Sequence, residues 1–193
     1  MAVAVASWHL EGATFYELYS AKNLEAYTNY YYQFNVCNSN NTSPVGRTKT
    51  TPNADDDVTK VGLAIYSCSN YPFGFFNAYG NPVRKDSVDY VVHLGDYIYE
   101  YKNGDYGWGQ SIGRVPQPDK EIFSLYDYRK RLATYPTDLD LVASHQQFSW
   151  KSVWDDHVGA GGLRLHMDGD PQQHHLWSFE IDGYGEMSSR SQD

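Results

Sequence analysis

Three short apolar runs lie in the middle and second half of the chain, at residues 61–66 (VGLAIY), 90–94 (YVVHL) and, more weakly, 148–154 (FSWKSVW). Within these runs apolar residues mostly follow one another instead of alternating with polar ones. Continuous apolar runs are typical of strands covered on both faces, as in parallel α/β sheets. The pattern therefore predicts three buried strands in a parallel sheet.

Between the second and third runs, a set of mostly apolar residues recurs at the spacing of a helix. Within residues 121–135 (EIFSLYDYRKRLATY) one set of positions recurs every three or four residues. The set is Ile122, Leu125, Tyr128 or Arg129, Leu132 and Tyr135. A second helix is predicted to begin at TDLDLVASH, with Thr137 as its N-cap and Asp140 in the capping-box position.

The segment at residues 101–121 (YKNGDYGWGQSIGRVPQPDKE) is rich in glycine and proline. A connection of this length without regular structure is uncommon in a compact domain unless it has a function or is disordered. We expect either a lid or binding loop, or a disordered segment.

The first part of the chain has a different pattern. Residues 24–36 (LEAYTNYYYQFNV) alternate in places and are rich in β-formers, and a polar turn separates them from the short run RTKTT at 47–51. This predicts an antiparallel hairpin. The following TPNADDDVTK is typical of a linker, so we place a domain boundary near residues 52–58.

Composition narrows the possible classes of function. The 193 residues suit one main domain and part of another, and 41% hydrophobic with 20% charged residues is ordinary for a globular protein. The formal net charge of -9 argues against binding to nucleic acids or anionic membranes. No apolar run reaches membrane-spanning length, and no signal peptide is visible, so the compartment stays open. The pattern gives no oligomeric state.

Reactive side chains follow each of the three predicted strands. The tails are SCSNY after the first, GDYIYEY after the second and DDH after the third. Ligands bind beyond the carboxyl ends of strands in open α/β sheets, so we expect the tails to converge. Their Cys, Asp, Tyr and His residues can bind metal ions. Phenolate and thiolate favour trivalent iron, whereas carboxylate and water favour calcium, magnesium or manganese. His93, inside the second run, is interpreted as a core residue.

Longer segments around these tails carry a resemblance. They are residues 67–109, beginning SCSNYPFGFF and containing HLGDYIYEY, then DYRKRLATY, and finally DLDLVASHQQFSWKSVWDDH. Over residues 21–157 the chain resembles the PhoD-like alkaline phosphatase/phosphodiesterase family, in particular its fungal members. The resemblance implies an α/β (α+β) metallophosphoesterase fold of the calcineurin-like type, a β-sandwich flanked by helices. An immunoglobulin- or fibronectin-like β domain, with a tyrosine corner near Tyr30, would precede it.

The resemblance also implies roles for individual residues. A ferric ion would be held by Cys68, Asp96 and Tyr99, and Asp96 would bridge to calcium. Asp156 would be a further metal ligand, and His157 a proton donor or phosphate contact. A ligand thiolate must be free, so Cys37 and Cys68 are expected not to form a disulfide. The implied reaction is hydrolysis of a phosphate monoester or diester.

The resemblance ends at His157, where Val158 replaces the glutamate of the family. Residues 158–193 then form a divergent tail with no regular pattern. The domain prediction is a partial N-terminal β domain at 1–54 and the N-terminal half of the phosphatase domain at 58–157. Lys151 also places a charge in an otherwise apolar strand.

Three functional interpretations follow. The first is a metal-dependent phosphoester hydrolase. The second is a truncated, catalytically inactive fragment that keeps part of the metal site and leaves one face of its sheet in water. The third, an immunoglobulin-like binding module, is disfavoured because only a hairpin of such a module is present.

Overall fold

The computed structural model of the protein describes residues 2–10, 13–153, 155–157, 180–181 and 187–188. The predicted tail therefore lies almost wholly outside the described residues. From it the structure describes two short antiparallel strands, β8 (Glu180–Ile181) and β9 (Met187–Ser188). No helix in the described ranges is long and apolar enough to cross a membrane.

A three-stranded parallel sheet forms the centre of the α/β part, in the order β5-β6-β7. Its strands are β5 (Leu63–Tyr66), β6 (Tyr90–His93) and β7 (Ser149–Ser152). The register pairs Tyr66 with His93 and His93 with Ser152, so the three carboxyl ends lie level. The predicted parallel sheet is confirmed.

The two faces of this sheet differ. On one face Ala64 and Val91 are buried together with Phe148 in a small core. On the other face Leu63 and Ile65 remain 50% and 59% exposed. The prediction that the strands are covered on both faces is thus wrong for much of the second face, because the described residues that pack there reach only one end of it.

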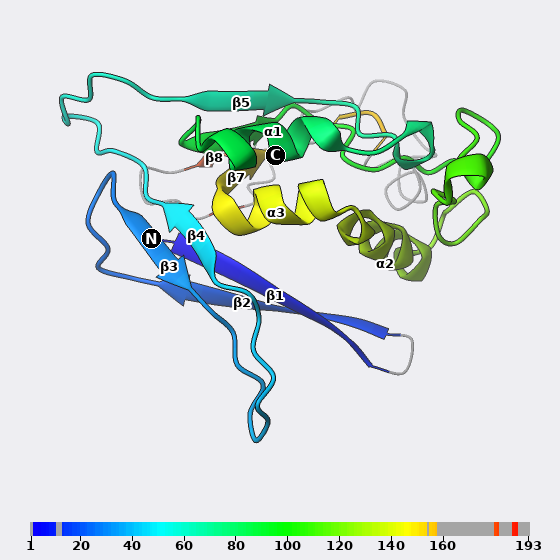
Figure 1. The fold of residues 1–193 in the computed structure, drawn as a ribbon, viewed down its shortest axis with the longest axis horizontal. Helices are drawn as coiled ribbons and strands as arrows, with labels where there is room; N and C mark the ends of the chain where they lie inside the picture. The colour runs from blue at the N-terminus through cyan, green and yellow to red at the C-terminus, as the bar shows by residue number, and fades with distance from the viewer. Residues whose placement is uncertain (1, 11–12, 154, 158–179, 182–186, 189–193) are drawn as a thin grey trace, which may run out of the picture.

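Three α-helices accompany the sheet in the described part of the chain, and Figure 1 shows α1 and α3 side by side. They are α1 (Asn77–Lys85), α2 (Leu125–Thr134) and α3 (Leu139–Gln147), with short 3-10 turns at η1 (Tyr71–Phe73), η2 (Gln110–Ile112) and η3 (Tyr135–Thr137). Helix α1 was not predicted, because Gly80 and Pro82 lower its helix propensity. A Cβ at Gly80 would lie 2.1 Å from the Asp140 carboxylate, so glycine lets α1 approach α3.

The predicted cap of α3 is wrong by one residue. The N-cap is Asp138, whose carboxylate accepts a hydrogen bond from the Leu141 N–H at 3.2 Å. Thr137 instead ends η3 and donates its hydroxyl to the Thr134 carbonyl at 2.6 Å. Because the cap is Asp138, Asp140 is only two residues beyond it and not in the capping-box position; it pairs with Arg84 at 2.6 Å instead. Helix α2 begins at Leu125, four residues inside the predicted range, with Ser124 as its cap.

The first part of the chain contains two antiparallel hairpins. Strands β1 (Ala2–Leu10) and β2 (Ala13–Ala21) form a pair that was not predicted. Strands β3 (Asn29–Tyr32) and β4 (Gly46–Lys49) form the predicted hairpin. The immunoglobulin- or fibronectin-like domain and the domain boundaries remain predictions.

A tyrosine hydrogen bond and a set of polar contacts tie the β3–β4 hairpin in place. The Tyr30 hydroxyl accepts from the Glu25 N–H at 2.8 Å, the type of contact found in a tyrosine corner. Towards the sheet, Lys49 pairs with Asp89 at 2.6 Å, and the Ser149 hydroxyl donates to the Lys49 carbonyl at 3.0 Å. The hairpin therefore covers the amino-terminal end of the second sheet face. Lys151, beyond this cover, is exposed, which explains how the strand accommodates its charge.

Candidate active site

Two tight turns follow β5 and β6 and carry the first predicted ligands. Cys68 and Asp96 both have left-handed backbone conformations, with φ of 60° and 52°. The Cys68 N–H donates to the Gly95 carbonyl at 3.2 Å, and the Ser69 N–H donates to the Asp96 carbonyl at 2.8 Å. These two bonds, both donated by the first turn to the second, join the turns, and the Cys68 Sγ lies 3.8 Å from the Asp96 Oδ2.

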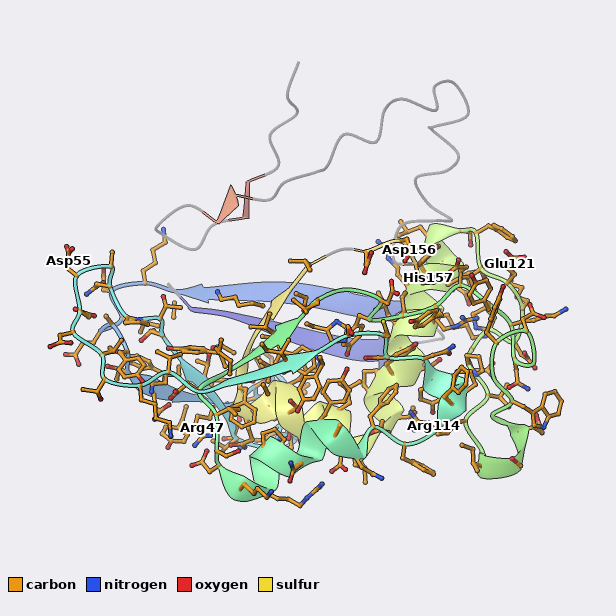
Figure 2. The ribbon with its side chains drawn as sticks, turned by 90° about the horizontal axis from the view of Figure 1, so that it is seen from above. Arg47, Asp55, Arg114, Glu121, Asp156 and His157 are labelled. Carbon is orange, nitrogen blue, oxygen red and sulfur yellow. The ribbon has the colours of Figure 1, made fainter. Side chains whose placement is uncertain are left out.

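The third tail packs directly on the second turn. The backbone N–H of His157 donates to the Asp96 Oδ1 at 3.2 Å. Gly95 has φ of 111°, and a Cβ there would lie 2.3 Å from the Asp155 Cβ, so this position needs glycine for both conformation and space. Figure 2 shows Asp156 and His157 together, at the end of the molecule towards which the parallel strands point. The three tails converge as predicted.

A potential ligand group results from this convergence. One ligand atom each from Asp96, Asp156 and His157 lies within 4.8 Å of the others. Asp96 is 6% exposed, whereas the Asp156 side chain is 80% exposed. The group is therefore buried on the side of Asp96 and open to solvent on the side of Asp156.

Tyr99 completes the predicted set. Its hydroxyl donates to the Asp96 Oδ2 at 3.3 Å, and its ring centroid lies 4.5 Å from that of His157. Burial, followed by the neighbouring Cys68 and Asp96, raises the pKa of the Tyr99 phenol. A bound cation would act in the opposite direction and favour the phenolate.

Glu100 is a site residue that the sequence interpretation missed. Its Oε2 lies 3.1 Å from the Nδ1 of His157, and the Glu100 side chain is 12% exposed. Glu100 thereby fixes the orientation of the His157 ring through Nδ1, and Nε2 is the ring nitrogen that remains for a ligand. The signal available in the sequence was the position of Glu100 in GDYIYEY, four residues after Asp96.

An open cleft of about 660 Å³ adjoins these residues, within the size range of small-molecule sites. Cys68, Tyr99 and His157 lie in its wall. Aromatic rings dominate the remainder: Tyr66, Phe73, Phe75, Phe76, Tyr79, Tyr101 and Tyr106. Among the described residues of this lining, none is Lys, Arg, Asp or Glu. An anionic ligand in this cleft would thus meet no Lys or Arg side chain among the described residues of the wall.

The loop at 101–121 is ordered around Arg131. Of the two alternatives predicted for it, the disordered segment is therefore wrong. Arg131 is 1% exposed, and its guanidinium donates to a set of backbone carbonyls. They belong to Tyr99, Tyr101, Gln117, Pro118 and Lys120. The same guanidinium therefore holds both ends of the loop and the backbone of Tyr99.

The donor set fits a metal ion. The Cys68 Sγ and the Asp96 Oδ2 are 3.8 Å apart, close enough for one ion to bond both, since typical metal–sulfur and metal–oxygen bonds are about 2.3 Å and 2.1 Å. Cys37 and Cys68 are both free, which confirms that they do not form a disulfide. The thiol required for such a site is therefore available.

Comparisons with known proteins agree with this arrangement. The family model of the PhoD-like phosphatases matches residues 63–159. Alkaline phosphatase D of Bacillus subtilis (strain 168) is 41% identical over 138 residues, which is 71% of this chain and 23% of that protein. A solved structure of PhoD matches with a TM-score of 0.65 and 39% identity, over 75% of this chain and 26% of that chain.

The chain thus spans about a quarter of the length of the relatives it matches, 23% of one and 26% of the other. The matched part contains all three parallel strands and all three tails. Its sequence, its fold and the convergence of the tails lead to one conclusion: the chain belongs to the PhoD-like phosphatase family.

Proposed function

We propose that this chain carries part of the catalytic site of a metal-dependent phosphate ester hydrolase. The observation that supports it most directly is the convergence of Cys68, Asp96, Tyr99 and Asp156 beyond three parallel strands. A thiolate, a phenolate and carboxylates in one place favour a metal ion over a purely organic ligand. The substrate would be a phosphate monoester or diester, as the family implies.

Two metal positions follow from the chemistry of the donors. Cys68, Asp96 and Tyr99 supply the soft and phenolic donors that suit ferric iron. Asp96 and Asp156 supply the carboxylate oxygens that suit calcium. When bound, these ions would neutralise the charge of the phosphoryl oxygens and activate water.

Charge supports this assignment. Among the described residues, the cleft wall contains no Lys or Arg, and the whole chain has a formal net charge of -9. Near the ligand group lie the further carboxylates of Glu100 and Asp155. A phosphate dianion would be repelled by this surface unless cations were bound there first.

His157 is proposed to handle protons and contact phosphate. Its ring lies in the cleft wall, and Glu100 holds the Nδ1 at 3.1 Å. In this position the Nε2 can donate a proton to a leaving oxygen, while Glu100 keeps the ring in place through Nδ1. Tyr99, whose ring lies 4.5 Å away, restricts the rotation of the imidazole.

The alternative, a chain that binds metal without turnover, depends on the number of ligands. The described residues supply Cys68, Asp96, Tyr99, Asp156 and His157, whereas two-metal catalysis needs both ions held about 3.5 to 4 Å apart by a full ligand set. We therefore expect the chain alone to bind ferric iron through Cys68 and Asp96 and to show no hydrolysis beyond that of a ligand variant.

Metal binding and turnover of the purified chain test these statements separately. Ferric iron and calcium are added to the parent and to Asp96→Ala, and binding is followed by absorbance and by equilibrium dialysis. Hydrolysis of p-nitrophenyl phosphate and bis(p-nitrophenyl) phosphate is then measured. Equal metal binding by parent and variant would refute the proposed site. Turnover well above the variant would refute the inactive alternative.

A further inference from the structure

A buried polar group lies directly beneath the two ligand turns. It consists of Ser69, Tyr79 and His93, which are 4%, 4% and 0% exposed. The His93 Nε2 lies 2.9 Å from the Ser69 Oγ and 3.1 Å from the Tyr79 hydroxyl. Ser69 and Tyr79 also hydrogen bond to each other through their hydroxyls. None of these side chains takes part in the proposed reaction.

His93 contacts both turns at once. Its Nδ1 accepts from the Gly95 N–H at 3.4 Å, and Gly95 precedes Asp96. Since a neutral ring has one N–H, the proton then lies on Nε2, which donates to the Ser69 Oγ at 2.9 Å. Ser69 follows Cys68. Each nitrogen of the ring therefore binds the neighbour of one predicted ligand.

Aromatic rings fix the orientation of the imidazole. Trp150 and Tyr79 are stacked with it, each at an interplanar angle of 17°, with centroids 6.0 Å and 6.4 Å away. Tyr97 meets its edge, with centroids 5.3 Å apart. A rotated ring would lose these packing contacts and both hydrogen bonds.

The backbone of the ligands requires such support. Cys68 and Asp96 have φ of 60° and 52°, a region that residues other than glycine rarely adopt. Unusual backbone conformations persist where the surrounding structure imposes them, and they are frequent at functional sites. Here the imposing contacts are the two backbone hydrogen bonds from the Cys68 turn to the Asp96 turn, and the His93 imidazole beneath them.

We propose that His93 is a positioning residue, which acts through Ser69 and Gly95 to hold Cys68 and Asp96 at the separation that a shared metal ion needs. The inference rests on the proposed function, because the ligand roles of Cys68 and Asp96 belong to it. His93 itself touches neither metal nor substrate. Loss of its bonds should weaken metal binding by about 10 to 100-fold, as for other residues that orient metal ligands.

The test compares two buried serines in a Cys37→Ser background. Ser69→Ala removes the partner of His93, whereas Ser144→Ala removes a hydroxyl that is 0% exposed and has no hydrogen-bond partner among the described residues. Cobalt(II) serves as the probe, because its charge-transfer absorption reports the bond to the Cys68 thiolate. We expect about 10 to 100-fold weaker cobalt binding in Ser69→Ala and parental binding in Ser144→Ala.

A second readout does not involve metal. With Cys37 replaced, the rate at which a disulfide reagent modifies Cys68 reports the geometry of its turn. We expect a faster reaction in Ser69→Ala than in the parent or in Ser144→Ala. Circular dichroism spectra identify any variant that has not folded.

Substitutions of His93 add a rescue experiment. The side-chain amide of glutamine can place a donor near the position of Nε2, whereas leucine offers none. We expect His93→Gln to bind cobalt more tightly than His93→Leu. If Ser69→Ala binds cobalt like the parent while Asp96→Ala does not, the positioning role is refuted. If Asp96→Ala also binds like the parent, the metal site itself is refuted.

Discussion

The carboxylate of Asp138 lies 2.8 Å from the guanidinium of Arg114, and both side chains are only 3% exposed. The same carboxylate caps α3 through the Leu141 N–H and accepts from the Phe76 N–H at 3.0 Å. Arg114 lies over the ring of Tyr71, with 3.9 Å between its Cζ and the ring centroid. One acid thus joins the 101–121 loop to the starts of α1 and α3.

Removing this acid should destabilise the fold strongly. Asp138→Ala leaves a buried guanidinium without its partner, which typically costs about 3 to 5 kcal/mol. Urea unfolding measures the free energy of unfolding. Asp140→Ala is the matched control on the same helix, because its partner Arg84 is 58% exposed and such pairs contribute about 0 to 1 kcal/mol. Equal losses in the two variants would contradict the central role of Asp138.

Arg131 should control the order of the loop at 101–121. Lysine cannot reproduce a guanidinium fork that binds several carbonyls, so Arg131→Lys leaves buried carbonyls without donors. We expect a loss of about 3 kcal/mol in the free energy of unfolding. We also expect faster tryptic cleavage after Lys102 and Lys120. Replacement of the exposed Arg129 by lysine should change neither property.

Stability should fall as the pH drops below about 6.5, the ordinary histidine value. Burial lowers the pKa of His93 in the folded protein, so between the two pKa values the unfolded chain binds more protons. The stabilisation that neutral His93 contributes to the fold is fully present above the pKa that His93 has in the unfolded chain. Below it, the contribution decreases by up to about 1.4 kcal/mol per pH unit.

Urea unfolding at pH 7.5 and 5.5 measures this difference. His93→Gln, which cannot titrate, should lose less stability between the two pH values than the parent. The same slope in both proteins would show that His93 is not the group responsible.

Gly95 should tolerate no side chain. Its φ of 111° is unfavourable for other residues, and an added Cβ would collide with Asp155 at 2.3 Å. Gly113 offers a matched control, since it has φ of 70° and open space around the position of a Cβ. Gly113→Ala should cost about 1 to 2 kcal/mol from the left-handed backbone alone. Gly95→Ala should cost more and should also weaken metal binding, because it displaces the tail with Asp156 and His157.

The sequence pattern was sufficient for the sheet and for the convergence of the tails. Continuous apolar runs identify parallel strands, and the ends of parallel strands meet at one edge, so Cys68 and Asp96 could be placed together. The role of Glu100 could not be found in this way. It depends on His157, 57 residues later in the chain, and on a turn geometry that no periodicity reports. Helix α1 was missed for another reason, because close packing on α3 overrides the low propensity of Gly80 and Pro82.

The cover of the sheet shows a further limit. The run VGLAIY indicated burial on both sides, but Ile65 is 59% exposed. Apolar character shows that a side chain favours an apolar neighbour, and it does not identify that neighbour. The position of the β3–β4 hairpin at one end of the face depends on contacts such as Lys49 with Asp89, which are separated by 40 residues.

The two backbone hydrogen bonds from the turn of Cys68 to the turn of Asp96 involve no side chain, so exchange of a ligand would leave them in place. Metal preference can therefore change without a change of framework. Aspartate tolerates a left-handed backbone better than most residues, and Cys68→Asp would convert the site to oxygen donors. Its selectivity should then move from soft or trivalent ions towards magnesium, calcium or manganese. A single amino-acid substitution would thus be enough to adapt this framework to a different supply of metals.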